Sequence, residues 1–232
     1  NKEKLAEAAA LIDAAKKPFL IFGQGVMLGE AERELKSFID KTGIPAAWTL
    51  LGLSALNTDH PLNVGMLGMH GNYGPNIKTN ECDVLIAVGM RFDDRVTGTL
   101  NTYAKQAKII HIEIDPAEIH KNVKADVALL GDAKKILRLL THIVSPNKHK
   151  EWVKEFRQAD AVENKKVIHS DLFPEKPGLT MGEVVRRVSE FTKNEAVIVS
   201  DVGQHQMSAA RYSKFRQSRS HITLGGLGTM GY

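Results

Sequence analysis

Two arginines and two aspartates stand within residues 91–95 (RFDDR), which follow residues 83–88 (DVLIAV) after Gly89 and Met90. The preceding run is apolar and typical of a buried strand, so the charged run lies at a strand's carboxyl end. In an open parallel sheet, ligands bind beyond the carboxyl ends of the strands. An arginine there can recognise a phosphate through planar, bidentate hydrogen bonds. The alternative is a salt-bridge cluster on the surface, but the position after the strand favours ligand contact.

Paired glycines follow another short apolar segment. Residues 23–25 (GQG) come directly after residues 18–22 (PFLIF), and glycine lets a ligand approach the backbone closely. The run departs from the dinucleotide motif G-x-G-x-x-G because Leu28 occupies the last glycine position, which weakens a dehydrogenase interpretation. A tight strand-to-helix turn would also carry glycine, so this run alone leaves ligand contact open.

A second glycine-rich run, residues 65–71 (GMLGMHG), adds two methionines and His70. Flexible backbone beside soft apolar side chains suits a flat aromatic ring. A loop with core methionines and a structural histidine is the alternative.

Glu113 ends a further apolar segment, where an acidic residue can bind ribose hydroxyls. Asp132 follows the next segment and is also a common helix N-cap.

Two more motifs lie near the end of the chain. Residues 201–207 (DVGQHQM) follow residues 195–200 (EAVIVS) and open a predicted helix, where backbone N–H groups can hold a phosphate. The alternative is an N-cap with a glycine turn. Residues 225–231 (GGLGTMG) hold too many glycines for the interior of a helix or strand. They predict a tight loop against a ligand or another chain.

Helices and strands must alternate to position these runs. Apolar spacing predicts helices at residues 4–15, 31–42 and 132–141, and strands at 18–22, 44–49, 83–88, 108–114 and 126–130. This alternation predicts an α/β fold, a Rossmann-like parallel sheet with helices on both faces.

The later part of the chain has a different texture. Residues 148–158 form a predicted polar helix with Trp152 and Phe156 on one side, and residues 164–178 show little periodicity. A helix at 180–192 and a strand at 195–200 then begin a second α/β domain. We expect a first domain at residues 1–145, a linker at 146–178 and the start of a second domain at 179–232.

Composition excludes several classes of protein. The chain has 232 residues with 31 basic and 27 acidic side chains, a net charge of +4, and these charges are mixed along the chain. Nucleic-acid binding is not expected, since it usually needs a clustered basic face. No apolar run approaches the roughly 20 residues that span a bilayer, so no membrane partner is expected. The single cysteine, Cys82, fits a reducing compartment and an expected cytoplasmic location.

Taken together, the motifs resemble the catalytic large subunits of acetohydroxyacid synthase (acetolactate synthase), a family of thiamine-diphosphate enzymes. The matching strings, in the same order and spacing, are GMLGMHG (65–71), RFDDRVTG (91–98), IHIEIDPAEI (110–119), DVGQHQM (201–207) and GGLGTMGY (225–232). The resemblance implies a middle domain that binds FAD without net redox work, followed by the start of a domain that binds thiamine diphosphate with Mg²⁺.

The resemblance also implies a reaction. Two pyruvates, or pyruvate and 2-oxobutyrate, are joined with loss of CO₂ in the biosynthesis of branched-chain amino acids. Such enzymes are homodimers or tetramers with active sites between subunits, and a small regulatory subunit can accompany them.

The resemblance places cofactor-binding residues position by position. For FAD it implies Gly23, Gln24, Gly25, Thr49, Leu50, Leu67, Gly68, Met69, His70, Gly89, Met90, Arg91, Asp93, Arg95, Val96, Glu113, Ile114 and Asp132. For thiamine diphosphate it implies Val202, Gly203, Gln204, His205, Gly228 and Met230. Asp94 and Arg95 correspond to positions near the substrate channel.

Two parts of the family pattern are missing from this sequence. The domain with the glutamate that activates the cofactor is absent, and the sequence stops before the GDG…N motif that holds Mg²⁺. We therefore expect a piece of a longer enzyme, inactive alone, with no catalytic residue or metal ligand of its own. The alternatives are another thiamine-diphosphate enzyme with the same middle domain, such as a glyoxylate carboligase or pyruvate oxidase, or a nucleotide-binding module without catalysis.

Overall fold

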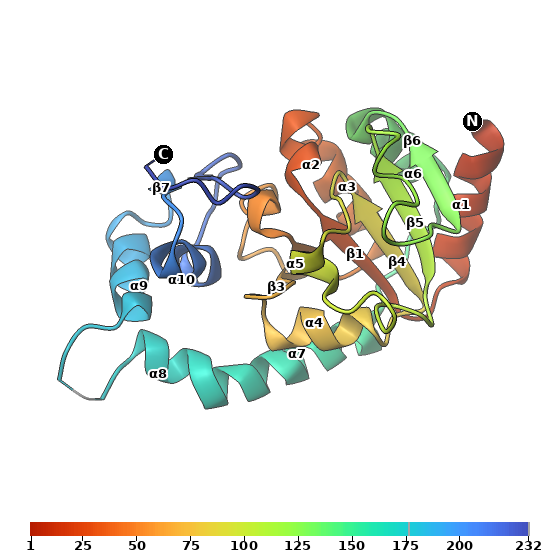
Figure 1. The fold of residues 1–232 in the computed structure, drawn as a ribbon. Coiled ribbons are helices and arrows are strands. Elements are labelled where there is room, and N and C mark those ends of the chain that lie inside the picture. Colours follow the sequence, from red (N-terminus) through yellow and green to blue (C-terminus); the bar gives the residue numbers. More distant parts are fainter. Residues whose placement is uncertain (176, 232) are drawn as a thin grey trace.

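A six-stranded parallel sheet organises the first part of the chain in the computed structural model, which describes residues 1–175 and 177–231 (Figure 1). Its strands, in spatial order, are β3 (Asn63–Met66), β2 (Ala46–Trp48), β1 (Pro18–Phe22), β4 (Val84–Val88), β5 (Lys108–Glu113) and β6 (Val127–Leu130). All neighbouring pairs are parallel. In this order the chain leaves β1 toward both edges, which opens a crevice beyond the carboxyl ends of β1 and β4. The predicted α/β fold is confirmed.

Helices cover both faces of the sheet because its central strands are apolar on both sides. Every residue of β1 and β4 is buried. Leu20 and Phe22 join a core with α1 (Lys2–Ala14), α3 (Glu32–Thr42) and α6 (Ala133–Ile143). Phe19 and Ile21 point to the opposite core, which contains the aromatic rings of Trp152 and Phe156.

Local signals account for the ends of these helices. Gly43 ends α3 with φ of 66°, a left-handed conformation that glycine adopts without steric cost. Asp132 begins α6, and its side chain accepts a hydrogen bond from the Lys135 amide at 2.9 Å.

Several short elements were not predicted. They are strand β3, helices α2 (Gln24–Leu28), α4 (Tyr73–Thr79) and α5 (Asp94–Thr97), and the 3₁₀ turn η1 (Leu50–Gly52). Among the described strands, β3 pairs only with β2, and it holds Gly65 at φ of 105°. Asparagine and glycine are poor strand formers, so no periodicity marked this edge strand.

Residues 146–178 are more helical than expected. Helix α7 (Lys150–Glu163) passes through a π-helical turn, Asn164–Ile168, into α8 (His169–Leu172), so the predicted end at residue 158 and the irregular stretch that followed were wrong. The π-helical turn buries no residue, which explains why hydrophobic spacing did not reveal it. The linker boundaries stay a prediction, and Lys176 within them lies outside the described residues.

The beginning of α7 packs against the first sheet. The indole of Trp152 donates from Nε1 to the Pro18 carbonyl at 2.8 Å. The ring of Phe156 is fully buried, 5.1 Å from that of Phe19. The first half of α7 therefore belongs to the core of the first domain.

The last part of the chain docks beside the carboxyl end of the sheet (Figure 1). It contains α9 (Met181–Phe191), β7 (Ile198–Ser200), α10 (Gln204–Tyr212) and β8 (His221–Thr223), with β7 and β8 paired in parallel. Phe215 is fully buried in the core of the first domain, and its carbonyl accepts from the Thr58 amide at 3.0 Å. None of the described helices is both long and apolar enough to cross a membrane.

Candidate functional site

A cavity of about 1020 Å³ lies at the carboxyl ends of the parallel strands. Turns after all six strands contribute to its walls, as do residues of the docked last part of the chain. Since all strands run in one direction, these turns meet at one edge of the sheet. A ligand in this cavity would contact segments that are far apart in the sequence.

Two glycines form the floor of the cavity, in the crevice between β1 and β4. The Gly25 amide donates to the Gly89 carbonyl at 2.8 Å. A Cβ atom on Gly25 would lie 2.6 Å from Gly89 Cα, which is too close for any side chain. Gly89 itself has φ of 55°, a conformation that favours glycine. Both glycines also line the cavity, so a ligand there meets backbone without an intervening side chain.

The glycine-rich loop at residues 65–71 forms a second wall. Its Met69 amide donates to the Arg95 carbonyl at 2.8 Å, so the loop is joined to the turn after β4. A Cβ atom on Gly68 would lie 2.7 Å from the same carbonyl oxygen. Leu67 is buried while Met69 is 60% exposed, and both line the cavity with His70. The loop thus presents soft apolar groups and one imidazole.

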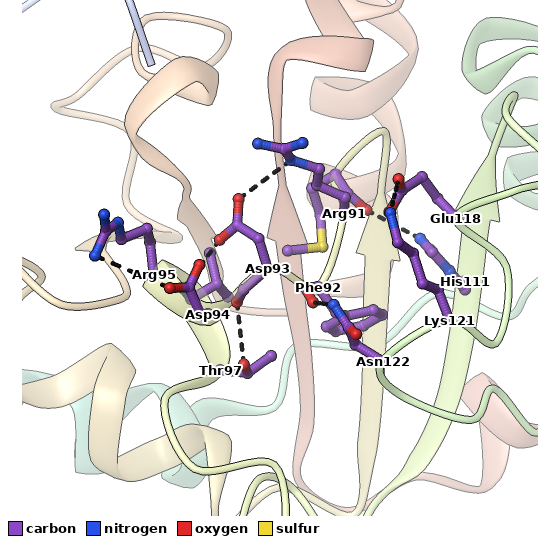
Figure 2. A network of polar contacts seen from close by, with 12 residues as sticks. Arg91, Phe92, Asp93, Asp94, Arg95, Thr97, His111, Glu118, Lys121 and Asn122 are labelled. Atoms are coloured by element: carbon purple, nitrogen blue, oxygen red, sulfur yellow. Dashed lines mark hydrogen bonds and ion pairs between the residues drawn. The ribbon is translucent and has the colours of Figure 1, made fainter. Parts of the chain in front are cut away.

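The charged turn after β4 begins α5 and is ordered by its own aspartate (Figure 2). Asp93 caps α5 by accepting from the Val96 amide at 3.3 Å, and also accepts from Nε of Arg91 at 3.2 Å. Arg95 lies 3.9 Å from Asp94, and both side chains are largely exposed. The local ion pairs of the surface-cluster interpretation are present, and the same side chains line the cavity.

A buried histidine of β5 holds the backbone of this turn, and it was not among the site residues expected from the sequence. Nε2 of His111 lies 2.9 Å from the Met90 carbonyl oxygen (Figure 2). Burial lowers the pKa of His111, and the hydrogen bond to Met90 only partly opposes this effect. A neutral imidazole therefore holds the backbone of Met90 in place. Its strand position among isoleucines was the one available signal.

Strand β5 ends in a carboxylate that is fixed by backbone amides. Oε1 of Glu113 accepts from the amides of Ile114 at 2.8 Å and Asp115 at 3.2 Å. Two N–H donors orient the carboxylate toward the cavity edge, where Glu113 is one of the lining residues. This geometry suits hydroxyl donors of a ligand.

Two parts of the chain match profiles of known protein families. A family profile described as "Thiamine pyrophosphate enzyme, central domain" matches residues 5–140. The chain belongs to the thiamine pyrophosphate enzyme family. The profile "Thiamine pyrophosphate enzyme, C-terminal TPP binding domain" matches residues 201–232.

Curated relatives of this thiamine pyrophosphate enzyme chain carry closely related names. A "Probable acetolactate synthase large subunit" of Methanocaldococcus jannaschii is 41% identical over 99% of this chain and 39% of its own length. An "Acetolactate synthase" of Mycobacterium bovis is 41% identical over 100% of this chain and 38% of its own length. An "Acetolactate synthase large subunit" of Corynebacterium glutamicum is 40% identical over 100% of this chain and 37% of its own length. The chain thus spans under two fifths of the length of these relatives.

Within this family frame, the structure gathers most residues that the resemblance implied for FAD. All of them except Gly23 and Gly68 line the cavity, and Arg91, His70 and Glu113 share it. Gly23 and Gly68 instead lie against backbone, beside Gly89 and Arg95 respectively. Asp94 and Arg95 line the cavity as well.

The residues implied for thiamine diphosphate are divided. Val202 and Gly228 line the cavity, whereas Gly203, Gln204, His205 and Met230 lie outside the lining. Among the described residues, α10 has no side-chain hydrogen bond at its N-cap Gly203. Its first N–H groups can therefore serve an anionic ligand. Tyr232 of the matching string lies outside the described residues.

Further lining residues were not assigned to a site from the sequence. They are Leu28, Gly29, Leu51, Met66, Ile112, Asp115, Glu118, Gly131, Ala133, Gln206, Met207, Leu224, Gly225 and Gly226. Met66, Gln206, Met207, Gly225 and Gly226 lie in the motifs at residues 65–71, 201–207 and 225–231, which the sequence did reveal. Apolar or glycine positions such as Leu28, Gly29 and Leu51 carried no chemical signal beyond their nearness to the end of a strand. Within the part of the chain that the structure describes, no group of three His, Cys, Asp or Glu side chains is arranged to hold a metal ion.

Proposed function

We propose that this chain is the FAD-binding middle domain and the start of the diphosphate-binding domain of an acetolactate synthase large subunit. The whole subunit would form acetolactate from pyruvate, or acetohydroxybutyrate with 2-oxobutyrate, in branched-chain amino-acid biosynthesis. The observation that carries the proposal is the single cavity shared by Arg91, His70 and Glu113. The names of the similar proteins point the same way.

The cavity fits a flavin nucleotide by size and by chemistry. Its volume of about 1020 Å³ is at the upper end of the roughly 300–1,000 Å³ of ordinary ligand pockets. Leu67, Met69 and Met90 offer apolar contact to a flat ring. Arg91 and Arg95 offer bidentate donors to a diphosphate. The required features are therefore present around one space.

The chain's own residues would bind and orient the nucleotide without chemical steps. The bare backbone at Gly25 and Gly89 would lie against the diphosphate, and the oriented Glu113 carboxylate would accept from ribose hydroxyls. FAD, when bound, would supply a structural ring system with no net redox role. Asp94 and Arg95 would stand near the substrate channel.

Thiamine diphosphate would belong to the last part of the chain. Residues near the start of α10 and in the glycine-rich end would contact it, namely Val202, Gly203, Gln204, His205, Gly228 and Met230. Thiamine diphosphate supplies the reacting carbon in this family, and these residues would hold its diphosphate and its bent shape. Mg²⁺, a homodimer or tetramer, a small regulatory subunit and a cytoplasmic location belong to the proposal for the whole subunit.

Flavin binding to the full chain tests the proposal. We expect the fluorescence of FAD to be quenched as protein is added, and FAD to elute together with the protein in gel filtration. Arg91→Gln should weaken FAD binding roughly tenfold or more, since a hydrogen bond to a charged group contributes about 1.5–3 kcal/mol. The matched control is Arg138→Gln, an exposed arginine of α6 that does not line the cavity.

Three results would count against this function. Absence of FAD binding to the wild-type chain would contradict the flavin site. In the whole subunit, peroxide formation from pyruvate or CO₂ release from glyoxylate, without acetolactate, would favour the pyruvate oxidase or glyoxylate carboligase alternative. FAD binding with no thiamine-dependent product from the whole subunit would favour the non-catalytic nucleotide-binding module.

A further inference from the structure

Arg211 of α10 reaches across to the outer side of the glycine-rich loop. Its Nη1 donates to the Gly71 carbonyl at 3.0 Å and more weakly to the His70 carbonyl at 3.4 Å. Its Nη2 donates to Glu163, the last residue of α7, in a short ion pair. One guanidinium thus joins three segments that lie far apart in the sequence.

The pair is sheltered from water, which strengthens its effect. The Glu163 side chain is 7% exposed and that of Arg211 19%. Such a pair is costly to break, because loss of one partner leaves a buried charge without compensation. Exposed ion pairs contribute little to stability by comparison. An example is Arg95 with Asp94, whose side chains are 72% and 81% exposed.

The network continues into the loop itself. The second oxygen of Glu163 accepts from Nδ2 of Asn72 at 3.2 Å, and Oδ1 of Asn72 accepts from the Met66 amide at 3.0 Å. The Asn72 amide donates to the Met66 carbonyl at 2.7 Å. The base of the loop is therefore closed by Asn72, and Asn72 is held by Glu163.

This arrangement separates two roles along the same loop. Leu67, Met69 and His70 line the cavity, while the carbonyls of His70 and Gly71 accept hydrogen bonds from Arg211. A displacement of α10 would therefore alter the backbone that carries the imidazole. Conversely, a ligand that fixes the loop would favour the docked position of α10, because coupling between sites is reciprocal.

We propose that Arg211 and Glu163 are positioning residues that couple occupancy of the nucleotide cavity to docking of the diphosphate-binding segment, residues 201–231. The inference rests on the proposed function for the identity of the nucleotide as FAD. The loop is held in its binding shape only while α10 is docked. FAD bound at the loop in turn stabilises α10 in place.

Amide hydrogen exchange on the full chain, with and without FAD, tests this coupling. Without ligand, Arg211→Gln should raise exchange at residues 66–72 at least tenfold relative to wild type. In wild type, FAD should slow exchange in α10, and in Arg211→Gln this transfer of protection should be lost. FAD affinity should fall about fivefold to tenfold in the variant.

A second variant and a matched control separate the pair from general damage. Glu163→Gln should reproduce the effects of Arg211→Gln, and the double variant should lose no more than either alone, because the two act as one unit. Arg187→Gln removes an arginine that pairs with the buried Glu183 within the neighbouring helix α9 at 2.7 Å and makes no hydrogen bond to the loop. It should leave exchange at residues 66–72 unchanged.

The outcomes distinguish this inference from the proposed function. Unchanged exchange at residues 66–72 in Arg211→Gln, or an equal rise in Arg187→Gln, would overturn the coupling even if FAD binds. If the wild-type chain binds no FAD but the Arg211→Gln substitution still loosens the loop, the positioning role stands and the flavin assignment is overturned. Loss of FAD affinity with additive effects in the double variant would overturn the pair as a unit.

Discussion

Gly25 and Gly89 meet across the crevice between β1 and β4, with the Gly25 amide donating to the Gly89 carbonyl at 2.8 Å. A Cβ on Gly25 would stand 2.6 Å from Gly89 Cα. The strand order places this contact where the chain diverges to the two edges of the sheet. Two turns that are distant in sequence therefore approach as closely as backbone permits, and together they form the floor of the cavity.

Gly25→Ala should lower both stability and FAD affinity, because the added methyl meets backbone that cannot move aside alone. Overpacking of this kind costs about 1–3 kcal/mol. Urea unfolding followed by tryptophan fluorescence would measure the loss. Gly226→Ala is the control, since a Cβ there has open space around it, and it should change the free energy of unfolding by less than about 0.5 kcal/mol. Equal stability of the two variants would contradict the close contact.

The sequence was sufficient for the features that rest on periodicity. The runs around Leu85 and Ile110 are apolar and branched, and both became central strands at nearly the predicted bounds. Strand direction fixes the end of the sheet at which each turn lies, so the positions of Arg91 and Glu113 at the carboxyl ends of the strands could also be predicted. Strand β3 could not, since its pairing depends on the neighbouring β2 and on no pattern of its own.

The contacts between the two parts of the chain were beyond sequence reasoning for a different reason. Arg211 is one polar residue on a predicted helix, and nothing in its surroundings reveals a partner 48 positions earlier. Glu163 stands near the end of α7, in a stretch interpreted as a linker. Long-range ion pairs depend on the final docking geometry, whereas single-sequence patterns report local structure.

Lowering the pH from about 6.5 to 4 should destabilise the chain through His221, which is buried at 6% exposure. Burial lowers the pKa of His221 from 6.5 to about 4. Between these values the unfolded chain binds a proton that the folded chain does not, so the free energy of unfolding decreases as pH falls. At about 1.4 kcal/mol per unit, the contribution is roughly 3 kcal/mol.

Urea unfolding at several pH values would measure this slope. His221→Phe should reduce it, while His142→Gln, at an exposed position of α6, should leave it unchanged. The slope should not vanish, because burial also lowers the pKa of His111. An identical slope in wild type and His221→Phe would show that His221 is not the titrating group.

Phe156→Ala should destabilise the first domain by about 3–5 kcal/mol, because it removes a fully buried ring that packs against Phe19. Val162→Ala lies on the same helix at 43% exposure and should cost less than about 1 kcal/mol. Chemical denaturation monitored by tryptophan fluorescence would compare them. Similar small losses in both variants would mean that α7 is a linker and not a part of the core.

Ser54 gives the sharpest test of how the last segment docks. It has φ of 73°, unusual for a residue with a side chain, and its Oγ accepts from the amides of Ser220 at 3.1 Å and His221 at 3.3 Å. Ser54→Ala keeps the left-handed conformation and removes the acceptor, which should cost about 1–3 kcal/mol. Ser54→Gly removes the same acceptor but adopts this conformation without steric cost.

The expected order of stability is therefore wild type, then the glycine variant, then the alanine variant. Hydrogen exchange at the amides of Ser220 and His221 should rise in both variants, because both lose the serine oxygen. If docking depended on backbone shape alone, the glycine variant would instead match or exceed wild type and its amides would stay protected. An alanine variant as stable as wild type would remove Ser54 from the docking contacts altogether.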